Sequence, residues 1–343
     1  GFVREGWHVM HPATPYEHNW HIDLICEHLE AITFGTLLAR GLPNRVLFNV
    51  PPGSLKSFLI DVFWQSWEWG PCNMPHTQWL TSTYREDYAV RDSRRTRDLI
   101  TSEWYQQLWG DRVKLLGDGE RRFENEQRGF RWAVPFGSLT SGRADRLIID
   151  DPHSVDTAES DTDRATITRR FRESVPHRVN DPKASAIVVI MQRLHGIDVS
   201  GVIEQLRLPY VRVVIPMEFE VDRRCSTPIG RDPRTYDGEL FFPERWSREV
   251  VERMKGEMTA YAWASQMQQR PTPREGGEFQ RGWFDIVPGV PAGARRIRGW
   301  DLAATKAANP SSVSGPAYTV GVKIAEHQGT FYVEDVVRLR ASP

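Results

Sequence analysis

A short loop that ends in Lys56 and Ser57 lies between a strand-like run and a helix-like run of the sequence. At such a junction, free backbone N–H groups and the helix dipole face an anion. The lysine can reach the β- and γ-phosphates of a nucleotide, and the serine hydroxyl can bind Mg²⁺. We therefore predict an ATP-binding phosphate loop, a Walker A motif, formed by Pro52, Gly53, Ser54, Leu55, Lys56 and Ser57.

The loop departs from the usual pattern of such sites, G-x-x-x-x-G-K-[ST], at both glycine positions. Val50 occupies the first position and Leu55 the second. Only Gly53 is left to give the loop backbone freedom. The alternative interpretation of this segment is a surface turn with a chance Lys–Ser pair.

Two adjacent carboxylates, Asp150 and Asp151, follow a second apolar run. A triphosphate site needs such a pair, a Walker B motif, because one carboxylate holds Mg²⁺ and the next orients or deprotonates the attacking water. We assign the metal to Asp150 and the catalytic role to Asp151. A strand that enters an Asp-Pro turn is the alternative, but the two motifs together favour one joint site.

The elements that must position these groups alternate between strand and helix patterns. Apolar or β-branched runs are found at residues 46–50, 78–83, 146–150, 184–191 and 210–215. This alternation predicts an α/β domain with a mainly parallel sheet. We expect a helix at 57–67, because its apolar residues repeat with a 3.6-residue period, and another at 22–32.

Two prolines and three glycines between residues 269 and 282 indicate a linker. We therefore predict a first domain at 1–268, a linker at 269–284 and a second domain at 285–343. The second domain should contain a strand that leads into Asp301, a loop at 309–316, and a hairpin at 318–324 and 330–337. About 60 residues are marginal for an independent core, so we expect this domain to be incomplete.

The composition excludes several classes of protein. The 343 residues include 44 Lys and Arg against 45 Asp and Glu, which excludes a uniformly basic nucleic-acid binder. With 40% hydrophobic and 26% charged residues, the chain is not disordered. No apolar run approaches the roughly 18 residues of a membrane helix. Three scattered cysteines match no metal-binding spacing.

In these motifs the chain resembles the large subunit of tailed-bacteriophage terminases, the DNA-packaging motor. The resemblance is carried, in the same order along the chain, by residues 20–29, 49–57, 81–84, 91–93, 137–153, 191–195 and 299–303. The loop Pro-Pro-Gly-Ser-Leu-Lys-Ser is similar to a form of the phosphate loop within that family.

The resemblance implies an ASCE-type P-loop ATPase, with ATP and Mg²⁺, followed by the start of an RNase H-like α/β nuclease domain that uses Mg²⁺ or Mn²⁺. The ATPase would drive translocation of double-stranded DNA into a procapsid, and the endonuclease would cut concatemeric DNA. The implied partners are a portal protein, a small terminase subunit and further copies of the chain, in a pentameric ring when docked and monomeric in solution. The implied location is the host cytoplasm, with no membrane and no place in the mature virion.

The resemblance also suggests roles for two polar residues of the ATPase. Arg143 lies in a loop rich in Ser, Thr and Gly and could neutralise the γ-phosphate of a neighbouring subunit. Gln192 follows the run at 186–191, where the family places its coupling motif, and its amide could detect the γ-phosphate. The alternatives are a solvated loop arginine and an ordinary polar strand end.

The family's nuclease holds two divalent metals with a cluster of acids. Asp301 fits the first of these acids, and Asp335 on a later strand could point into the same site. Two metals need more acids than these two, so we expect these 343 residues to lack nuclease activity.

Other residues allow two interpretations. Tyr16, Trp20 and His21 precede a helix and could contact adenine, or could pack in the core. A second group consists of arginines in one expected helix: Arg91, Arg94, Arg95 and Arg97. These suit DNA phosphates, but the interleaved aspartates favour a solvated helix with ion pairs.

Two alternatives to a packaging motor remain at this point. One is a helicase-like, DNA-dependent ATPase, against which the Gly299-Trp300-Asp301 motif argues, since it stands in place of a second motor domain. The other is a packaging scaffold that binds nucleotide without hydrolysing it.

Overall fold

The computed structural model describes residues 1–139, 142–272, 284–302 and 319–339. The chain forms two compact units, Gly1–Pro273 and Arg274–Pro343. The division falls within the segment predicted as a linker, of which residues 273–283 lie outside the described part, as does the loop predicted at 309–316. In the part of the chain that is described, no helix is both long and apolar enough to cross a membrane.

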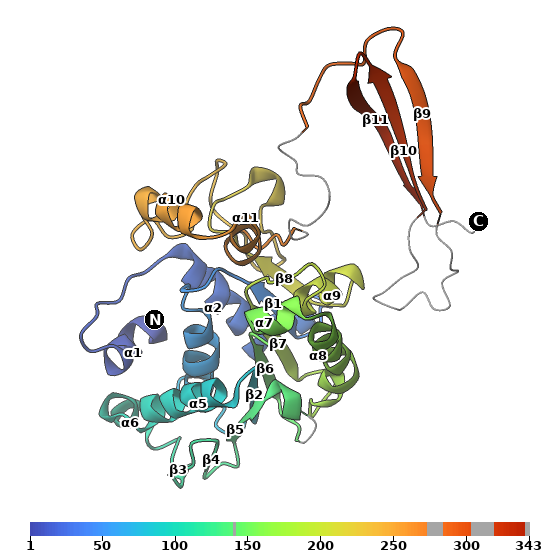
Figure 1. Ribbon diagram of the computed structural model, residues 1–343. Helices are drawn as coiled ribbons and strands as arrows, with labels where there is room; N and C mark the ends of the chain where they lie inside the picture. Colours follow the sequence, from blue (N-terminus) through green and yellow to red (C-terminus); the bar gives the residue numbers. More distant parts are fainter. Residues whose placement is uncertain (140–141, 273–283, 303–318, 340–343) are drawn as a thin grey trace. The chain divides into compact units, whose positions relative to one another are not determined.

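The first unit is built around an eight-stranded sheet (Figure 1). Its strands are β1 (Arg45–Asn49), β2 (Trp79–Thr83), β3 (Leu115–Leu116), β4 (Arg122–Asn125), β5 (Phe130–Pro135), β6 (Arg146–Asp150), β7 (Ala186–Met191) and β8 (Val211–Val214). They lie in the order β3-β4-β5-β2-β6-β7-β1-β8. The pairs β3–β4 and β4–β5 are antiparallel, and every other pair of neighbouring strands in this order is parallel. The predicted α/β class with a mainly parallel sheet is confirmed.

The helices cover both faces of this sheet. They are α1 (Phe2–Met10), α2 (Trp20–Thr33), α3 (Thr36–Ala39), α4 (Trp64–Trp69), α5 (Glu86–Thr101), α6 (Glu103–Trp109), α7 (Val155–Glu159), α8 (Asp161–Ser174), α9 (Val199–Gln205), α10 (Arg248–Glu257) and α11 (Ala260–Ala262). Short 3-10 turns are found at Phe136–Ser138, Val175–His177 and Val221–Arg223, and a π-helix at Trp263–Met267.

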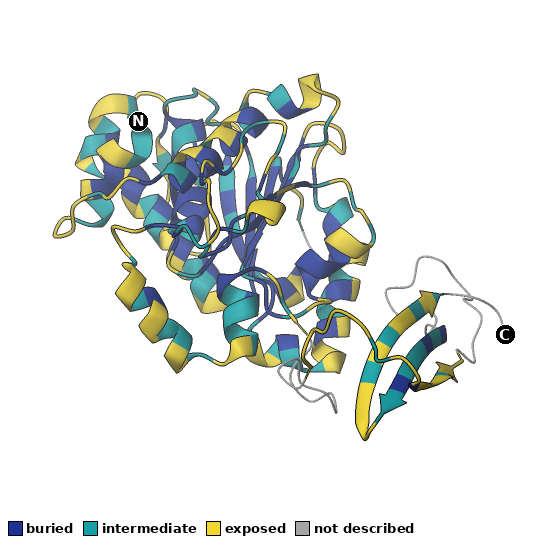
Figure 2. Cartoon of the chain, turned by 90° about the horizontal axis from the view of Figure 1, so that it is seen from above, coloured by how far each residue is buried: buried dark blue, intermediate teal, exposed yellow. Residues whose placement is uncertain are grey.

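Alternate residues of each strand belong to opposite layers of the core. Val46 and Phe48 pack with α2, whereas Leu47 packs with α8 and α9. Figure 1 shows α2 and α5 on one side of the sheet and α8 and α9 on the other. The central strands are therefore buried on both faces, as Figure 2 shows, which explains their continuous apolar runs.

The helix after the phosphate loop differs from its prediction. A π-helix, η1 (Phe58–Phe63), comes first, and α4 continues the helix to Trp69. All six residues of η1 are buried, so the segment is covered on every side and has no single apolar face. Short π-helical segments occur often at functional sites, and this one carries the buried acid Asp61.

The order of the strands positions the predicted site. Strand β7 lies between β1 and β6, with Asn49 paired to Met191 and Asp150 paired to Ile190. One strand thus lies between the phosphate-loop strand and the acidic strand. Because all three strands are parallel, their carboxyl ends lie at one edge, where open α/β sheets bind ligands.

The second unit contains a three-stranded antiparallel sheet in the order β11-β10-β9 among the described residues. Its strands are β9 (Arg295–Asp301), β10 (Thr319–His327) and β11 (Thr330–Leu339). Ion pairs cover one face, where Arg298 binds Asp335 and Glu334 binds both Arg296 and Lys323.

Candidate nucleotide site

Lys56, Asp151 and Gln192 meet at the edge where β1, β6 and β7 end. Lys56 Nζ donates a hydrogen bond to Asp151 Oδ2 at 2.8 Å, and the backbone N–H of Gln192 donates to Asp151 Oδ1 at 3.1 Å. The phosphate loop, the acidic strand and the strand between them are thus joined through one carboxylate.

Leu55 stands where the usual phosphate-loop motif has its second glycine, and its backbone has the left-handed conformation that glycine adopts easily. Gly53 and Leu55 both have left-handed backbones, with φ of 79° and 64°. A non-glycine residue there costs about 1–2 kcal/mol, so the surrounding structure enforces the loop despite Leu55. Gly53 is also required for packing, because a Cβ on it would lie 2.9 Å from Trp246 Cζ2.

A buried histidine supports this loop from α2. His21 Nε2 donates to the carbonyl of Ser54 at 3.0 Å. Its Nδ1 accepts a hydrogen bond from Asn19 Nδ2 at 2.6 Å, which places the ring proton on Nε2. Burial lowers the pKa of His21 to about 4, so the ring is neutral at pH 7. His21, one of three residues for which adenine contact or core packing was expected, is thus buried and hydrogen-bonded to the phosphate loop.

Lys56 keeps its charge although its side chain is only 7% exposed. Burial alone would lower the pKa of Lys56, but the carboxylates of Asp151 and Asp150 outweigh this effect and raise the pKa. The lysine is thus a buried, charged group at the base of the loop, as phosphate binding requires.

Asp150 is buried beside Ser57 and carries an unsatisfied oxygen. Burial, and then the charge of Asp151, raise the pKa of Asp150 well above its usual range, while Lys56 and a hydrogen bond to Ser57 oppose the rise. Asp150 Oδ1 has no hydrogen-bond partner among the described residues. A hydroxyl next to an orphaned carboxylate oxygen fits the ligands of Mg²⁺, which takes one or two carboxylates together with phosphate oxygens.

Sequence reasoning missed Asp61, which lies behind Asp150. Burial raises the pKa of Asp61 to about 7, while Arg131 opposes the rise, and Asp61 Oδ2 is buried with no hydrogen-bond partner among the described residues. The signal in the sequence was a lone acid in an apolar helix, four residues after Ser57.

A cavity of about 260 Å³ opens onto these groups. Its lining residues come from the phosphate loop, from the ends of β2, β6 and β7 and the residues that follow them, and from α5 and α7: Ser57, Thr83, Tyr84, Tyr88, Arg91, Asp92, Asp150, Asp151, His153, Ser154, Val155 and Gln192. The side-chain oxygen of Gln192 is buried without a partner among the described residues. The cavity therefore holds several polar atoms that a phosphate, a metal or water could satisfy.

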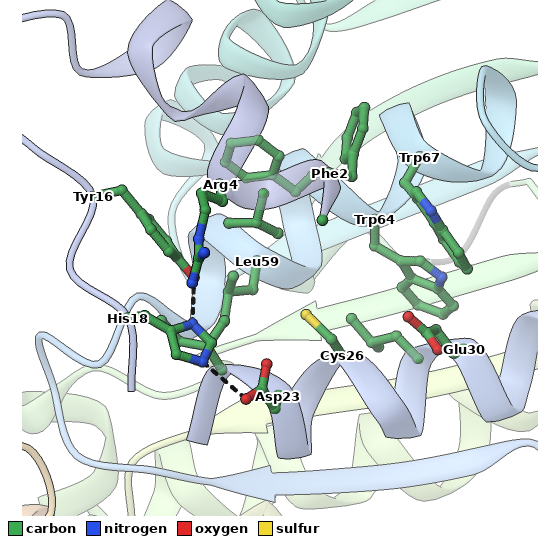
Figure 3. Close-up of a pocket in the computed structure, with 15 residues that line it drawn as sticks. Phe2, Arg4, Tyr16, His18, Asp23, Cys26, Glu30, Leu59, Trp64 and Trp67 are labelled. Carbon is green, nitrogen blue, oxygen red and sulfur yellow. Dashed lines mark hydrogen bonds and ion pairs between the residues drawn. The ribbon is translucent and has the colours of Figure 1, made fainter. Parts of the chain in front are cut away.

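A larger cavity of about 340 Å³ lies between α1, α2 and η1 (Figure 3). Aromatic rings of Phe2, Tyr16 and Trp64 line it, together with Asp23 and Cys26. None of its lining residues belongs to the phosphate loop or to the acidic strand. It is therefore separate from the groups that could bind phosphate.

Arg143 does not enter the 260 Å³ cavity of its own chain. It is exposed and precedes β6, whereas Asp150 ends that strand. Seven extended residues span roughly 20 Å, so Arg143 lies at the opposite edge of the sheet from the phosphate loop. Arg146, at the start of β6, is buried and pairs with Glu68 at 2.9 Å.

The structure does not bring Asp301 and Asp335 together. Asp335 pairs with Lys323, which pairs with Arg298, three residues before Asp301 on β9. Since side chains alternate along a strand, Asp301 lies on the face opposite to Arg298 and its partner Asp335. The expectation that Asp335 points into one metal site with Asp301 is therefore wrong. The described residues contain no group of three or more His, Cys, Asp or Glu suited to a metal.

Comparisons with known proteins give no match to a family model or to a curated protein. Solved structures of phage large terminases are similar. The HK97 bacteriophage large terminase matches 98% of this chain and 67% of its own, with 13% identity and a TM-score of 0.47. An arginine-to-alanine mutant of the Thermus phage P74-26 large terminase ATPase domain matches 75% and 95%, with 11% identity and a TM-score of 0.44.

Proposed function

We propose that the first unit is a Mg²⁺-dependent ATPase that drives double-stranded DNA into a procapsid. The observation that carries the ATPase is the 2.8 Å contact between Lys56 and Asp151 at the shared edge of β1, β7 and β6. The packaging role rests on the order of the sequence motifs shared with phage large terminases.

In this proposal each residue of the site has a separate task. Bound Mg²⁺ would neutralise phosphate charge and would be held by Ser57 and Asp150. Lys56 exchanges Asp151 for phosphate oxygens, which frees Asp151 Oδ2 to orient and deprotonate a water molecule. Asp151 Oδ1 keeps its hydrogen bond from the Gln192 backbone, so the carboxylate stays in place, and the Gln192 side chain contacts the γ-phosphate.

We propose an RNase H-like nuclease for the second unit, with domain limits of 1–268 and 285–343 around the linker. Asp301 is its proposed Mg²⁺ or Mn²⁺ ligand, on the basis of the Gly299-Trp300-Asp301 motif alone. Asp335 is not part of this proposal, because Arg298 holds it on the other face of the sheet.

We propose that the motor acts as a pentameric ring on a portal protein, with a small terminase subunit, in the host cytoplasm. The exposed position of Arg143, remote from the phosphate loop of its own chain, supports contact with the nucleotide of a neighbouring subunit.

ATP turnover and nucleotide binding, measured together, test the proposal. The wild-type chain should bind a fluorescent ADP and hydrolyse ATP only with Mg²⁺, whereas Lys56→Ala should lose both properties. Lys114→Ala, at an exposed position, is the matched control. Binding without turnover, even with DNA, small subunit and portal present, would favour a non-hydrolysing scaffold, and separation of forked strands would favour a helicase.

A further inference from the structure

The first half of α5 contributes a cation to the cavity that contains the candidate nucleotide site. Arg91 lines this cavity together with Ser57, Asp150 and Asp151. The later arginines of α5, Arg94 to Arg97, are not among its lining residues. Sequence patterning grouped Arg91, Arg94, Arg95 and Arg97 on one charged helix, and of these four only Arg91 lines the cavity.

Arg91 is bound by Asp92, which also has a second cationic partner. Its guanidinium donates to both carboxylate oxygens of Asp92, at 3.0 and 2.8 Å. The Asp92 side chain is only 3% exposed, so an unpaired charge there would be costly. Arg95 also binds Asp92, at 3.1 Å. Asp92 therefore keeps a cationic partner when Arg91 leaves it.

The surroundings of Arg91 favour a second, anionic partner. Its side chain is 45% exposed, which leaves it room to change rotamer. Tyr88 supports it, with the guanidinium carbon 5.0 Å from the ring centre. The hydrogen bonds to Asp92 raise the pKa of Arg91 most, and Asp150 and Asp61 raise it further, so the guanidinium lies within electrostatic reach of the acids of the site.

We infer that Arg91 binds the terminal phosphate of a nucleoside triphosphate within its own chain, in exchange for Asp92. The inference rests on the proposed nucleotide site and adds Arg91 as the residue that distinguishes a triphosphate from a diphosphate there. A planar guanidinium pairs with two phosphate oxygens at once, whereas a diphosphate leaves this position empty. Arg91 thus selects the triphosphate and transmits its presence to α5.

Titration with two nucleotides tests this inference. The probes are a fluorescent ADP and a non-hydrolysable ATP analogue, both with Mg²⁺. Arg91→Ala should weaken binding of the analogue about 10-fold or more, the usual range for hydrogen bonds to a charged group, and leave ADP binding unchanged. Arg91→Lys should recover part of the loss. Arg94→Ala, whose arginine pairs with the exposed Glu120, is the control and should change neither affinity.

The outcomes separate the inference from the proposed function. If the wild-type chain binds neither probe, the nucleotide site itself is wrong. If the wild type binds both probes and Arg91→Ala lowers both affinities equally, or neither, the role of Arg91 is refuted while the nucleotide site stands. Should Arg91→Ala fail to fold, Arg91→Gln, which keeps a hydrogen-bond donor beside Asp92 but no charge, replaces it and must show the same selective loss.

Discussion

Lys56 and Asp151 form a 2.8 Å ion pair across 95 residues of sequence. The pair exists because β1 and β6 flank β7 in parallel, and the backbone N–H of Asp151 is bound to the carbonyl of Ile190 on β7 at 2.8 Å. The cation and the carboxylate satisfy each other until a more highly charged anion competes for the lysine. When nucleotide binds, Lys56 would pair with phosphate oxygens instead of Asp151, and the Asp151 carboxylate would then be free to activate water.

Asp151→Asn separates binding from hydrolysis. The amide keeps the shape of the carboxylate but accepts no proton, so turnover should fall at least about 100-fold. Affinity for a non-hydrolysable ATP analogue should stay within about threefold, since Lys56 remains charged. Steady-state turnover and analogue titration measure the two effects, with the exposed Asp156→Asn as control. Equal loss in both assays would show that Asp151 binds nucleotide and has no separate catalytic role.

Leu55 provides a direct test of backbone strain in the phosphate loop. At its φ of 64°, Leu55→Gly should be more stable than Leu55→Ala by about 1 kcal/mol. Both variants lose the same leucine contacts, so their difference isolates the backbone. At Ala165 within α8, Ala165→Gly should instead be less stable by about 1 kcal/mol. Urea unfolding measures the free energy of unfolding of each variant. If Leu55→Ala is as stable as Leu55→Gly or more stable, the left-handed conformation of residue 55 is contradicted.

The buried His21 makes stability depend on pH. Its pKa is about 4 in the folded chain and near 6.5 when unfolded. The unfolded state therefore binds more protons between these values, and the stabilisation is complete above pH 6.5 and lost as the pH falls towards 4. The stability of the wild type relative to His21→Gln should drop by roughly 3 kcal/mol over this range.

Urea unfolding of both chains at a series of pH values measures this difference. His8→Gln, at an exposed position, is the control and should follow the wild type. A difference between wild type and His21→Gln that is independent of pH would show that His21 is not buried as a neutral ring.

Arg143 is tested by mixing inactive subunits. Arg143→Ala and Asp151→Asn should each abolish turnover of the assembled motor. Assemblies that contain both variants should recover part of the activity, because an intact arginine from one subunit can meet an intact carboxylate in the next. Mixtures that remain inactive at every ratio would exclude action of Arg143 between subunits.

The sequence predicted strands β1, β2, β6, β7 and β8 and missed β3, β4 and β5, which lie together at one end of the sheet. Strands β1, β6 and β7 are largely apolar runs that are buried on both faces, so composition identifies them. Strand β2 is also buried although it ends in Thr-Ser-Thr, and β8 alternates buried and more exposed residues. Strand β3 has two residues and β4 is largely polar, and their pairing depends on β5 and β2, which sequence patterns do not reveal.

Within the site, local motifs identified Lys56, Ser57, Asp150 and Asp151, because these follow strand ends. Asp61 and Arg91 were not recognised, since their importance comes from contacts with residues far along the chain. Arg91 stands among interleaved aspartates, a pattern that a solvated helix shares. Only the packing of α5 against β2 and β5 places it beside the acids.

A crystal structure with Mg²⁺ and a non-hydrolysable ATP analogue tests the central claim most directly. Our account predicts a phosphate oxygen within about 3 Å of Lys56 Nζ, the metal between Ser57 and Asp150, and Asp151 separated from the lysine. An analogue bound elsewhere, for example in the cavity of Figure 3, with the Lys56–Asp151 pair intact, would contradict it.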